Sequence, residues 1–323
     1  MPKRRISKQQ QGRIKKIQSE RLHRAHGQST DEDKHLGPEL NGLLVTHYGK
    51  YADVEYENDL YRCHFRQHLA GAVVGDHVVF RLDERKAGII VAIAPRKNSL
   101  YRMDDRQQQK NIAANIDQML VVMAKEPEPS TLLLDSYLVA AEVLGISPII
   151  IFNKMDLMDE DFLNSYVAVY AKLGYPLLKL SVVLQQGIEE LESLLNHKTN
   201  IFVGQSGVGK SSIISALLPD VELNIGQLHG ATGLGKHTTT VSKLYHLPHG
   251  GDLIDSPGIR EFSLWEMDAM TLAKGFKEFS SFVEQCKFRN CSHVHEPDCA
   301  VIKAMDDGNI SLLRWENYKK LLA

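Results

Sequence analysis

The stretch GQSGVGKS at residues 204–211 constrains the fold more than any other feature of the chain. It follows the apolar run IFV and precedes SSIISALL, so it joins a predicted strand to a predicted helix. Glycines in this setting let backbone N–H groups turn toward phosphates at the start of the helix, where the helix dipole favours anions. The stretch therefore predicts an α/β domain with a nucleotide site. The positions expected to bind nucleotide are Gly204, Gln205, Ser206, Gly207, Val208, Gly209, Lys210, Ser211 and Ser212.

The sequence NKMD at residues 153–156 indicates which base is bound. Guanine presents two donors on one edge, and the Asp156 carboxylate can accept both. Adenine offers no such pair, and the unpaired carboxylate should reject it by roughly four orders of magnitude. Asn153 and the aliphatic stem of Lys154 are expected to hold the loop and cover the ring, with Ser181 supporting the base loop. Together with the phosphate loop, these residues predict a site for GTP and GDP with Mg²⁺.

The phosphate and magnesium contacts are expected from the phosphate loop and from DSPG at residues 255–258. Lys210 should reach the β- and γ-phosphates as a catalytic residue, and the Ser211 hydroxyl should coordinate Mg²⁺. Asp255 follows the apolar run GDLI, so it leaves a predicted strand where it can hold the same ion. The backbone amide of Gly258 is placed to contact the γ-phosphate. Asp-Ser-Pro-Gly is also ordinary turn chemistry, but its position downstream of Lys210 favours the functional interpretation.

A Gly- and Thr-rich segment, GATGLGKHTTT, lies between these two stretches. Its composition suits a switch loop that changes conformation with the nucleotide. One of the adjacent Thr238 and Thr239 is expected to bind Mg²⁺ and sense the γ-phosphate, and we assign the metal and catalytic role to Thr239. Many GTPases place a Gln after D-x-x-G to orient the attacking water, but this chain has Ile259. Unassisted hydrolysis is therefore expected to be slow.

The order of these motifs is unusual, because the base loop precedes the phosphate loop. A parallel sheet tolerates circular permutation when the old termini lie close together and new ones open in an exposed connection. The order therefore predicts a circularly permuted α/β GTPase domain over residues 101–270. Within it, residues 130–145 should form a helix that Ser130 caps and Gly145 ends.

The N-terminal part divides into an arm and a barrel. Residues 1–26 contain nine Lys or Arg and one acid, so residues 1–39 are predicted to be a disordered basic arm and linker for nucleic acid, with a merely solvated tail as the alternative. Residues 40–100 show short strands of period two, with a hairpin expected at Asn58-Asp59. This pattern predicts a five-strand β-barrel of the OB-fold type. The alternative is a β-domain that binds only its neighbouring domain.

Residues 271–323 are predicted to be a mainly helical domain around a cysteine cluster. Three of the four cysteines lie within fourteen residues beside histidines, and this clustering favours a metal over disulfides. The pattern C-x4-C-x-H-x5-C supplies three thiolates and one imidazole, a closed set suited to structural zinc. His295 competes with His293 as the nitrogen ligand on spacing alone, and cysteines without metal are the alternative. No apolar run approaches 18 residues, so we expect a cytoplasmic protein without membrane contact.

The motif order, the switch sequence GKHTTT, the barrel and the cluster CKFRNCSHVHEPDCAV together resemble the RsgA (YjeQ) family of circularly permuted GTPases. The resemblance runs from about residue 40 to the C-terminus. It implies an OB-fold barrel, a permuted GTPase domain, a zinc domain and a bacterial cytoplasmic setting. It also implies a catalytic switch histidine at His237, for which contact with RNA or solvent is the alternative. The zinc ligands that it implies are Cys286, Cys291, His293 and Cys299.

The resemblance also indicates the function. The expected protein is a GTPase that binds the small (30S) ribosomal subunit as a monomer and assists its maturation. The subunit, with its 16S rRNA and ribosomal proteins, is expected to stimulate hydrolysis of GTP to GDP and phosphate. The alternative is a zinc-containing RNA-binding scaffold that binds guanine nucleotide without turnover. One departure from the usual pattern is SVVLQQG after residue 180, where such GTPases more often have Ser-Ala, so the loop around Val183 is expected to seat guanine differently.

Overall fold

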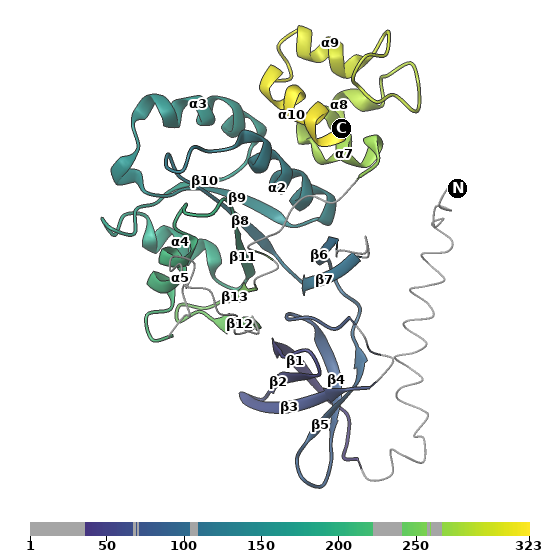
Figure 1. The fold of residues 1–323 in the computed structure, drawn as a ribbon, viewed down its shortest axis with the longest axis vertical. Coiled ribbons are helices and arrows are strands. Elements are labelled where there is room, and N and C mark those ends of the chain that lie inside the picture. The colour runs from purple at the N-terminus through teal and green to yellow at the C-terminus, as the bar shows by residue number, and fades with distance from the viewer. Residues whose placement is uncertain are drawn as a thin grey trace, which may run out of the picture.

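The computed structural model describes residues 36–66, 69, 71–103, 109–221, 241–256, 259 and 267–323. Residues 1–35 of the predicted arm lie outside this set, as do His237, Thr238, Thr239 and Gly258. The described chain has a β-barrel at one end, a central α/β domain and a helical region at the other end (Figure 1). Among the described residues, no helix has the length and apolar character needed to cross a bilayer.

The barrel contains five strands, whose bounds are β1 (Leu40–His47), β2 (Tyr51–Tyr56), β3 (Asp59–Phe65), β4 (His77–Leu82) and β5 (Gly88–Ile93). Their order is β1-β2-β3-β5-β4, and β4 pairs back with β1 to close the barrel. Only the pair β3 and β5 is parallel among these barrel pairings. Val54, Phe80 and Ile90 fill the interior with no exposed surface. The predicted OB-type barrel is confirmed.

The hairpin between β2 and β3 turns one residue earlier than expected. The turn residues are Glu57 and Asn58, and Tyr56 pairs with Asp59. Both turn residues have positive φ, 50° and 68°, as a two-residue type I′ turn requires. The prediction of Asn58-Asp59 was wrong because turn composition alone does not set the register of the two strands.

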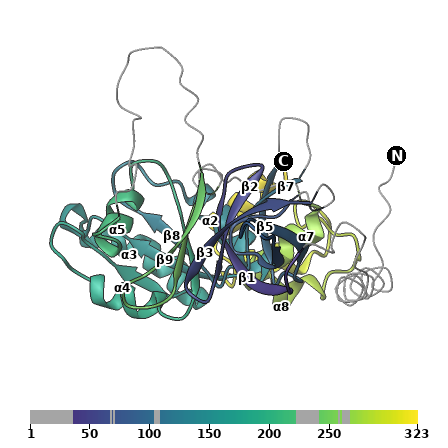
Figure 2. The same ribbon diagram turned by 90° about the horizontal axis from the view of Figure 1, so that it is seen from below.

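The central domain is built on a parallel sheet. Its strands are β8 (Gln118–Met123), β9 (Ser147–Phe152), β10 (Leu177–Lys179), β11 (Thr199–Val203) and β13 (Asp252–Asp255), with β12 (Ser242–His246) antiparallel to β13. The order is β10-β9-β8-β11-β13-β12. One apolar core packs α2 (Thr131–Leu144) and α3 (Glu160–Tyr170) on one face. A second packs α4 (Ile188–Leu195) and α5 (Lys210–Leu217) on the other, which confirms a sheet covered on both sides. Figure 2 shows this domain beside the barrel strands.

Helix α2 begins and ends where the sequence predicts. The Ser130 hydroxyl accepts a hydrogen bond from the Leu133 amide at 3.2 Å, and Gly145 takes the left-handed conformation with φ 67°. Both are standard signals at helix ends. Short 3-10 turns and a separate two-stranded sheet that was not predicted complete the domain: Met155–Leu157 (η2), Ala171–Leu173 (η3), β6 (Ser99–Met103) and β7 (Gln109–Ala114).

The C-terminal region is helical, as expected, with α7 (Ala269–Gly275), η4 (Lys277–Phe279), α8 (Ser280–Val283), α9 (Ala300–Asp306) and α10 (Leu312–Leu322). A buried ionic network attaches it to α2. The Arg314 guanidinium donates to Asp135 at 2.5 Å and to Glu278 at 2.7 and 3.1 Å, and the side chains of Arg314 and Asp135 are fully buried. Asp135 also accepts from Tyr170 and Asn317. Paired in this way, buried charges fix how the two parts meet.

The barrel and the α/β domain share one sheet of eleven strands, because β1 pairs with β12. The pairing is short, with Thr46 opposite Lys243 and His47 opposite Ser242. In Figure 1, β12 and β13 lie at the edge of the α/β domain that faces the barrel. The backbone thus connects the barrel to the nucleotide-binding sheet through a single strand.

Candidate active site

The phosphate loop connects β11 to α5, as predicted. Gly204, Gly207 and Gly209 all have positive φ, at 137°, 84° and 95°. A Cβ atom at Gly204 would lie 2.3 Å from the Val122 carbonyl oxygen of β8. The loop therefore requires glycine both for its backbone conformation and for its close approach to the neighbouring strand.

Lys210 is the first residue of α5, and its side chain turns back over the loop. Its ammonium donates to the carbonyl oxygens of Gly204 at 2.7 Å and Gln205 at 2.8 Å. The cation is thereby held inside the loop, where a phosphate group would bind. Ser211 follows as the second residue of α5, and both side chains are partly exposed.

Asn153 joins the predicted base loop to the phosphate loop. Its side-chain amide donates to the Val208 carbonyl at 2.9 Å, and the residue is only 2% exposed. A Cβ atom at Gly209 would lie 2.3 Å from the same amide nitrogen. Asn153 Oδ1 is buried and has no hydrogen-bond partner among the described residues. The two motifs that are distant in sequence thus meet in one site at the carboxyl ends of β9 and β11.

The remaining base-loop residues lie beside this contact. Lys154 has the left-handed conformation with φ 59°, and its ammonium donates to the Glu126 carbonyl at 2.9 Å. The exposed Asp156 accepts a hydrogen bond from the fully buried Ser181 hydroxyl at 2.6 Å. Ser181 thereby orients the carboxylate directly, a closer role than the support of the loop expected from the sequence.

Asp255 lies beside the phosphate loop, and Ile259 lies in the core. Asp255 is the last residue of β13, which pairs in parallel with β11 through Ile254 and Ile201. Its carboxylate therefore leaves the sheet one strand away from Gly204. Ile259 is 2% exposed and packs in the main apolar core. At the position where many GTPases have glutamine, this chain has a side chain that cannot orient water.

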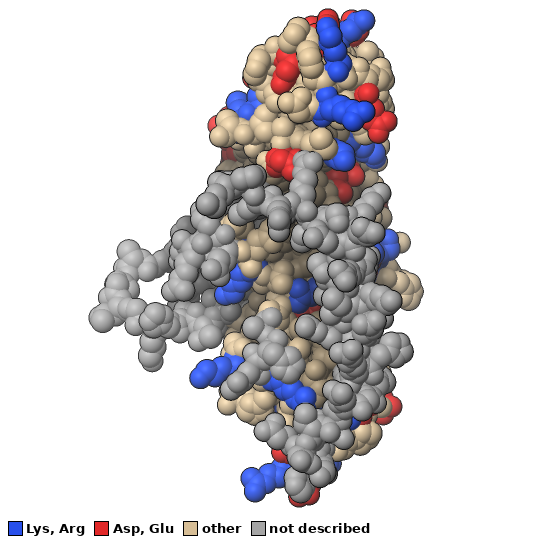
Figure 3. Space-filling model, turned by 90° about the vertical axis from the view of Figure 1, so that its right-hand side faces the viewer, with Lys and Arg blue, Asp and Glu red and all other residues tan. Residues whose placement is uncertain are grey.

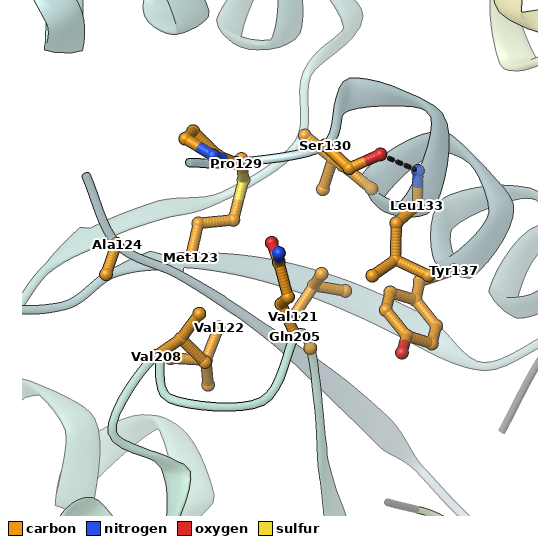
Figure 4. A pocket seen from close by; sticks show the side chains of 12 residues that line it. Val121, Val122, Met123, Ala124, Pro129, Ser130, Leu133, Tyr137, Gln205 and Val208 are labelled. Carbon is orange, nitrogen blue, oxygen red and sulfur yellow. Dashed lines mark hydrogen bonds between the residues drawn. The ribbon is translucent and has the colours of Figure 1, made fainter. Parts of the chain in front are cut away.

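A small cavity separates the phosphate loop from the start of α2. Its volume is about 20 Å³, enough for about one water molecule. Figure 4 shows Leu133 and Tyr137 of α2 on one side and Gln205 and Val208 of the loop on another. Burial raises the pKa of Tyr137, and a hydrogen bond from the Gly204 backbone partly opposes this shift. This contact between α2 and the loop was not predicted, because tyrosine in an apolar helix gives no signal beyond core packing.

Cys286, Cys291, His293 and Cys299 gather as one cluster, and their potential ligand atoms all lie within 4.8 Å of one another. The His293 Nδ1 atom is 3.5 Å from two sulfurs, and the Cys286 and Cys299 sulfurs are 3.9 Å apart. A tetrahedral zinc with Zn–S near 2.3 Å and Zn–N near 2.05 Å requires separations of about 3.8 Å and about 3.5 Å. The separations among Cys286, His293 and Cys299 therefore match a tetrahedral zinc ion, and Cys291 lies close enough to complete the set. The competing His295 is exposed.

Neighbouring groups hold the His293 loop in place. The Trp315 indole N–H donates to the His293 carbonyl at 2.9 Å, and the Tyr318 hydroxyl donates to the Ser292 carbonyl at 2.7 Å. Glu296 accepts from the Ser292 amide and hydroxyl at 2.7 and 2.6 Å. Although burial opposes it, the sum of these hydrogen bonds lowers the pKa of Glu296. Such outer contacts orient metal ligands, and no local sequence pattern predicts them.

Comparison with known proteins identifies the family. A family model described as "RsgA GTPase" matches residues 93–265, just over half of the chain. The "Small ribosomal subunit biogenesis GTPase RsgA" of Hahella chejuensis is 47% identical, with 99% of this chain and 96% of that protein covered. The protein of the same name from Pseudomonas fluorescens strain Pf-5 is 45% identical over 100% of this chain and 98% of its own length. The chain belongs to the RsgA family of GTPases.

Solved structures agree with membership of the RsgA family. YjeQ from Thermotoga maritima has a TM-score of 0.73 and 34% identity, and the match covers 88% of this chain and 98% of that one. YloQ, described as a circularly permuted GTPase, has a TM-score of 0.68 and 28% identity over 91% and 96% of the two chains. The predicted fold class, with its permuted nucleotide-binding domain, is therefore confirmed.

As an RsgA-family GTPase, the chain hydrolyses GTP and uses a guanine nucleotide with Mg²⁺. Of the predicted nucleotide-binding residues within the described part of the chain, the structure brings the phosphate loop, Asn153 and Asp255 to one edge of the sheet. Asp156 lies beside them in η2 after β9, hydrogen-bonded to Ser181 after β10. The roles assigned to these residues individually stay predictions.

Proposed function

We propose that this RsgA-family GTPase binds the small (30S) ribosomal subunit and assists its late maturation, with the subunit stimulating hydrolysis. The name of its relatives, small ribosomal subunit biogenesis GTPase, supports the partner. The hydrogen bond from Asn153 to the Val208 carbonyl supports the nucleotide site most directly, because it unites the base and phosphate loops. A cytoplasmic, monomeric protein is the simplest form for this function.

In the proposed site, Asp156 accepts the two guanine donors while Ser181 fixes the direction of its carboxylate. The Lys154 stem covers the base. Backbone amides of the phosphate loop hold the α- and β-phosphates, and the Lys210 ammonium exchanges its present carbonyl partners for the β- and γ-phosphates. Binding and orientation thus come from groups that the fold already holds close together.

Hydrolysis proceeds by in-line attack of water on the γ-phosphorus. A new P–O bond forms, the bond to the β-phosphate oxygen breaks with its electrons leaving on GDP, and the water proton ends on the products. Ser211, Thr239 and Asp255 would hold Mg²⁺, which neutralises charge on the phosphate oxygens. Because Ile259 is buried and apolar, another polar group must orient the water, and we assign that role to His237.

The zinc cluster would stabilise the helical region. Three thiolates and one imidazole form a closed structural set, and the distances among the Cys286, His293 and Cys299 ligand atoms match a tetrahedral ion. Metal binding of this kind contributes on the order of 10 kcal/mol to folding a segment with a small core. We therefore assign one structural Zn²⁺ to residues 271–323, beside a GTPase domain at 101–270 and a barrel at 40–100.

The barrel carries the groups expected for binding ribosomal RNA. Tyr48 and Tyr51 are 38% and 40% exposed, and the Arg62 guanidinium lies 4.5 Å from the Tyr48 ring centroid. A neighbouring open groove of about 530 Å³ includes His47, Lys50, His64, Phe65 and Arg66. Exposed rings and cations together suit stacked bases and phosphates. By contrast, cations and acids are interspersed over the helical end on the face in Figure 3.

Phosphate release from GTP, with and without purified small subunits, tests the proposal. We expect stimulation by the subunit in the natural chain and loss of nucleotide binding in Lys210→Ala with zinc content unchanged. Lys172→Ala, at an exposed position away from the phosphate loop, is the matched control and should behave as the natural chain. Binding without stimulation would favour a zinc-containing RNA-binding scaffold instead.

A further inference from the structure

Strand β12 lies between the barrel and the strand that carries Asp255. Lys243 of β12 is opposite Asp255 of β13 on one side and opposite Thr46 of the barrel on the other. At the same end, the Ser242 hydroxyl is 2.8 Å from the Ser256 hydroxyl, next to Asp255. The barrel backbone is therefore one strand away from the residue assigned to hold Mg²⁺.

The far end of β12 carries a second connection. The imidazole of His246 contacts Glu55 of barrel strand β2 through Nε2 at 2.5 Å and Asp252 through Nδ1 at 2.6 Å. Asp252 is the first residue of β13, and Asp255 is the last. Only a protonated imidazole can donate from both nitrogens at once. His246 thus acts as a cation that bridges two carboxylates, Glu55 of the barrel and Asp252 of the α/β domain, across the seam, by which we mean the boundary formed where β1 pairs with β12.

At this point the backbone pairing between the barrel and the sheet is short. The pairing of β1 with β12 consists of two residue pairs. Next to it, an open cleft of about 460 Å³ includes Asn41, Glu55, His77 and His246. The buried core continues from Leu44 and Val74 of the barrel to Leu244 and Ile254 of the sheet. At its edge, where the backbone pairing is short and the cleft is open, the His246 bridge connects side chains of the two domains directly.

We infer that His246 is a positioning residue through which the barrel and the nucleotide site influence each other. Ligand bound to the barrel holds β2 and Glu55, the bridge holds Asp252, and β13 transmits the restraint to Asp255. The inference rests on the proposed binding of the subunit by the barrel. Because such coupling is reciprocal, nucleotide and subunit must change each other's affinity by the same factor.

The test measures the affinity of the full chain for a non-hydrolysable GTP analogue, with and without saturating small subunits. In the natural chain we expect the affinities to differ by about fivefold or more. His246→Gln and Glu55→Gln should reduce this ratio toward one, whereas His246→Arg, which keeps the charge and two donors, should preserve it. His249→Gln is the matched control, because His249 contacts Glu192 within the α/β domain.

Each outcome is informative. An unchanged ratio in both His246→Gln and Glu55→Gln, in chains that keep their zinc and their unfolding temperature, would overturn the inference. If the natural chain binds subunits but its affinity for the GTP analogue is the same with and without them, the inference is also overturned, although the proposed subunit binding stands. A natural chain that does not bind subunits at all would refute the proposed function as well.

Discussion

The side-chain amide of Asn153 donates to the backbone carbonyl of Val208, 55 positions later in the chain, at 2.9 Å. Because Gly209 leaves no room for a Cβ atom beside the same amide, the two loops are fitted to each other. Base recognition and phosphate binding are therefore one structural unit, despite their reversed order in the sequence.

Asn153→Ala should weaken this unit. It leaves the Val208 carbonyl without its buried donor, a loss of about 1–3 kcal/mol. We expect guanine nucleotide affinity to fall by about 10- to 100-fold, measured with a fluorescent GDP analogue. Asn164→Ala, at an exposed position of α3, is the control. Equal affinity in the two variants would show that the contact does not organise the site.

Asp156→Asn should change base preference. The variant amide can pair with the extra carbonyl of xanthine but loses charge-assisted bonds to guanine, so GTP affinity should fall by about 10²- to 10⁴-fold. Comparing GTP and XTP binding measures the shift. Ser181→Ala should retain guanine preference with weaker binding, since Ser181 only orients the carboxylate. Retained GTP preference in Asp156→Asn would remove this residue from the base site.

Removing zinc should unfold the helical region locally around the cysteine cluster. We expect one zinc per chain by elemental analysis, and its loss in Cys299→Ser but not in Cys63→Ser, because Cys63 is buried in the barrel. The chain has two tryptophans, so the Trp265→Phe substitution leaves Trp315 as the single tryptophan. Its indole contacts the His293 carbonyl, so a chelator should shift its emission to longer wavelength. Emission that does not respond to zinc loss would contradict the assignment.

Arg314→Met should destabilise the attachment of the helical region to α2. Removing the guanidinium leaves the buried Asp135 carboxyl without its cationic partner, which costs about 3–5 kcal/mol. Denaturant unfolding should show this loss, and adding Asp135→Asn should recover part of it. Arg289→Met, at an exposed position, should change stability little. If the losses in unfolding free energy of Arg314→Met and Asp135→Asn simply add in the double variant, the two side chains do not interact directly.

The His246 bridge predicts a pH dependence. Although burial opposes it, hydrogen bonds to Glu55 and Asp252 raise the pKa of His246 above its ordinary value of 6.5. A raised pKa in the folded state means that the stabilisation is full below pH 6.5 and is lost as the pH rises through the raised value. The unfolding temperature should therefore fall less between pH 6 and pH 8.5 in His246→Gln than in the natural chain. Identical pH profiles would exclude the bridge.

Features that depend on neighbouring residues were predictable from the sequence. Ser130 and Gly145 mark the ends of α2 because their own chemistry satisfies helix termini. The phosphate loop and NKMD follow strand ends because the apolar runs before them form buried strands. Their convergence was predictable as well, since carboxyl ends of parallel strands share one edge.

Features that depend on distant partners were not predictable. Asp135 lies in the apolar run LLLDSYLVAA, and its partner Arg314 is 179 positions away. The pairing of β1 with β12 leaves no trace in either segment, because backbone hydrogen bonds do not depend on which side chains are present. The hairpin turn was displaced by one residue for a related reason, since the register follows from the barrel as a whole.

The strand pairing at His47 and Ser242 also has a consequence for how the newly made chain matures. Synthesis runs from the N-terminus, and domains generally fold as they emerge. The barrel is then complete while β1 still has an open backbone edge at His47, and the strand that closes it has not been translated. Closing that edge is therefore a late event in the biogenesis of the protein itself. A chain truncated before β12 would keep an unpaired strand edge that can pair with other chains and promote aggregation.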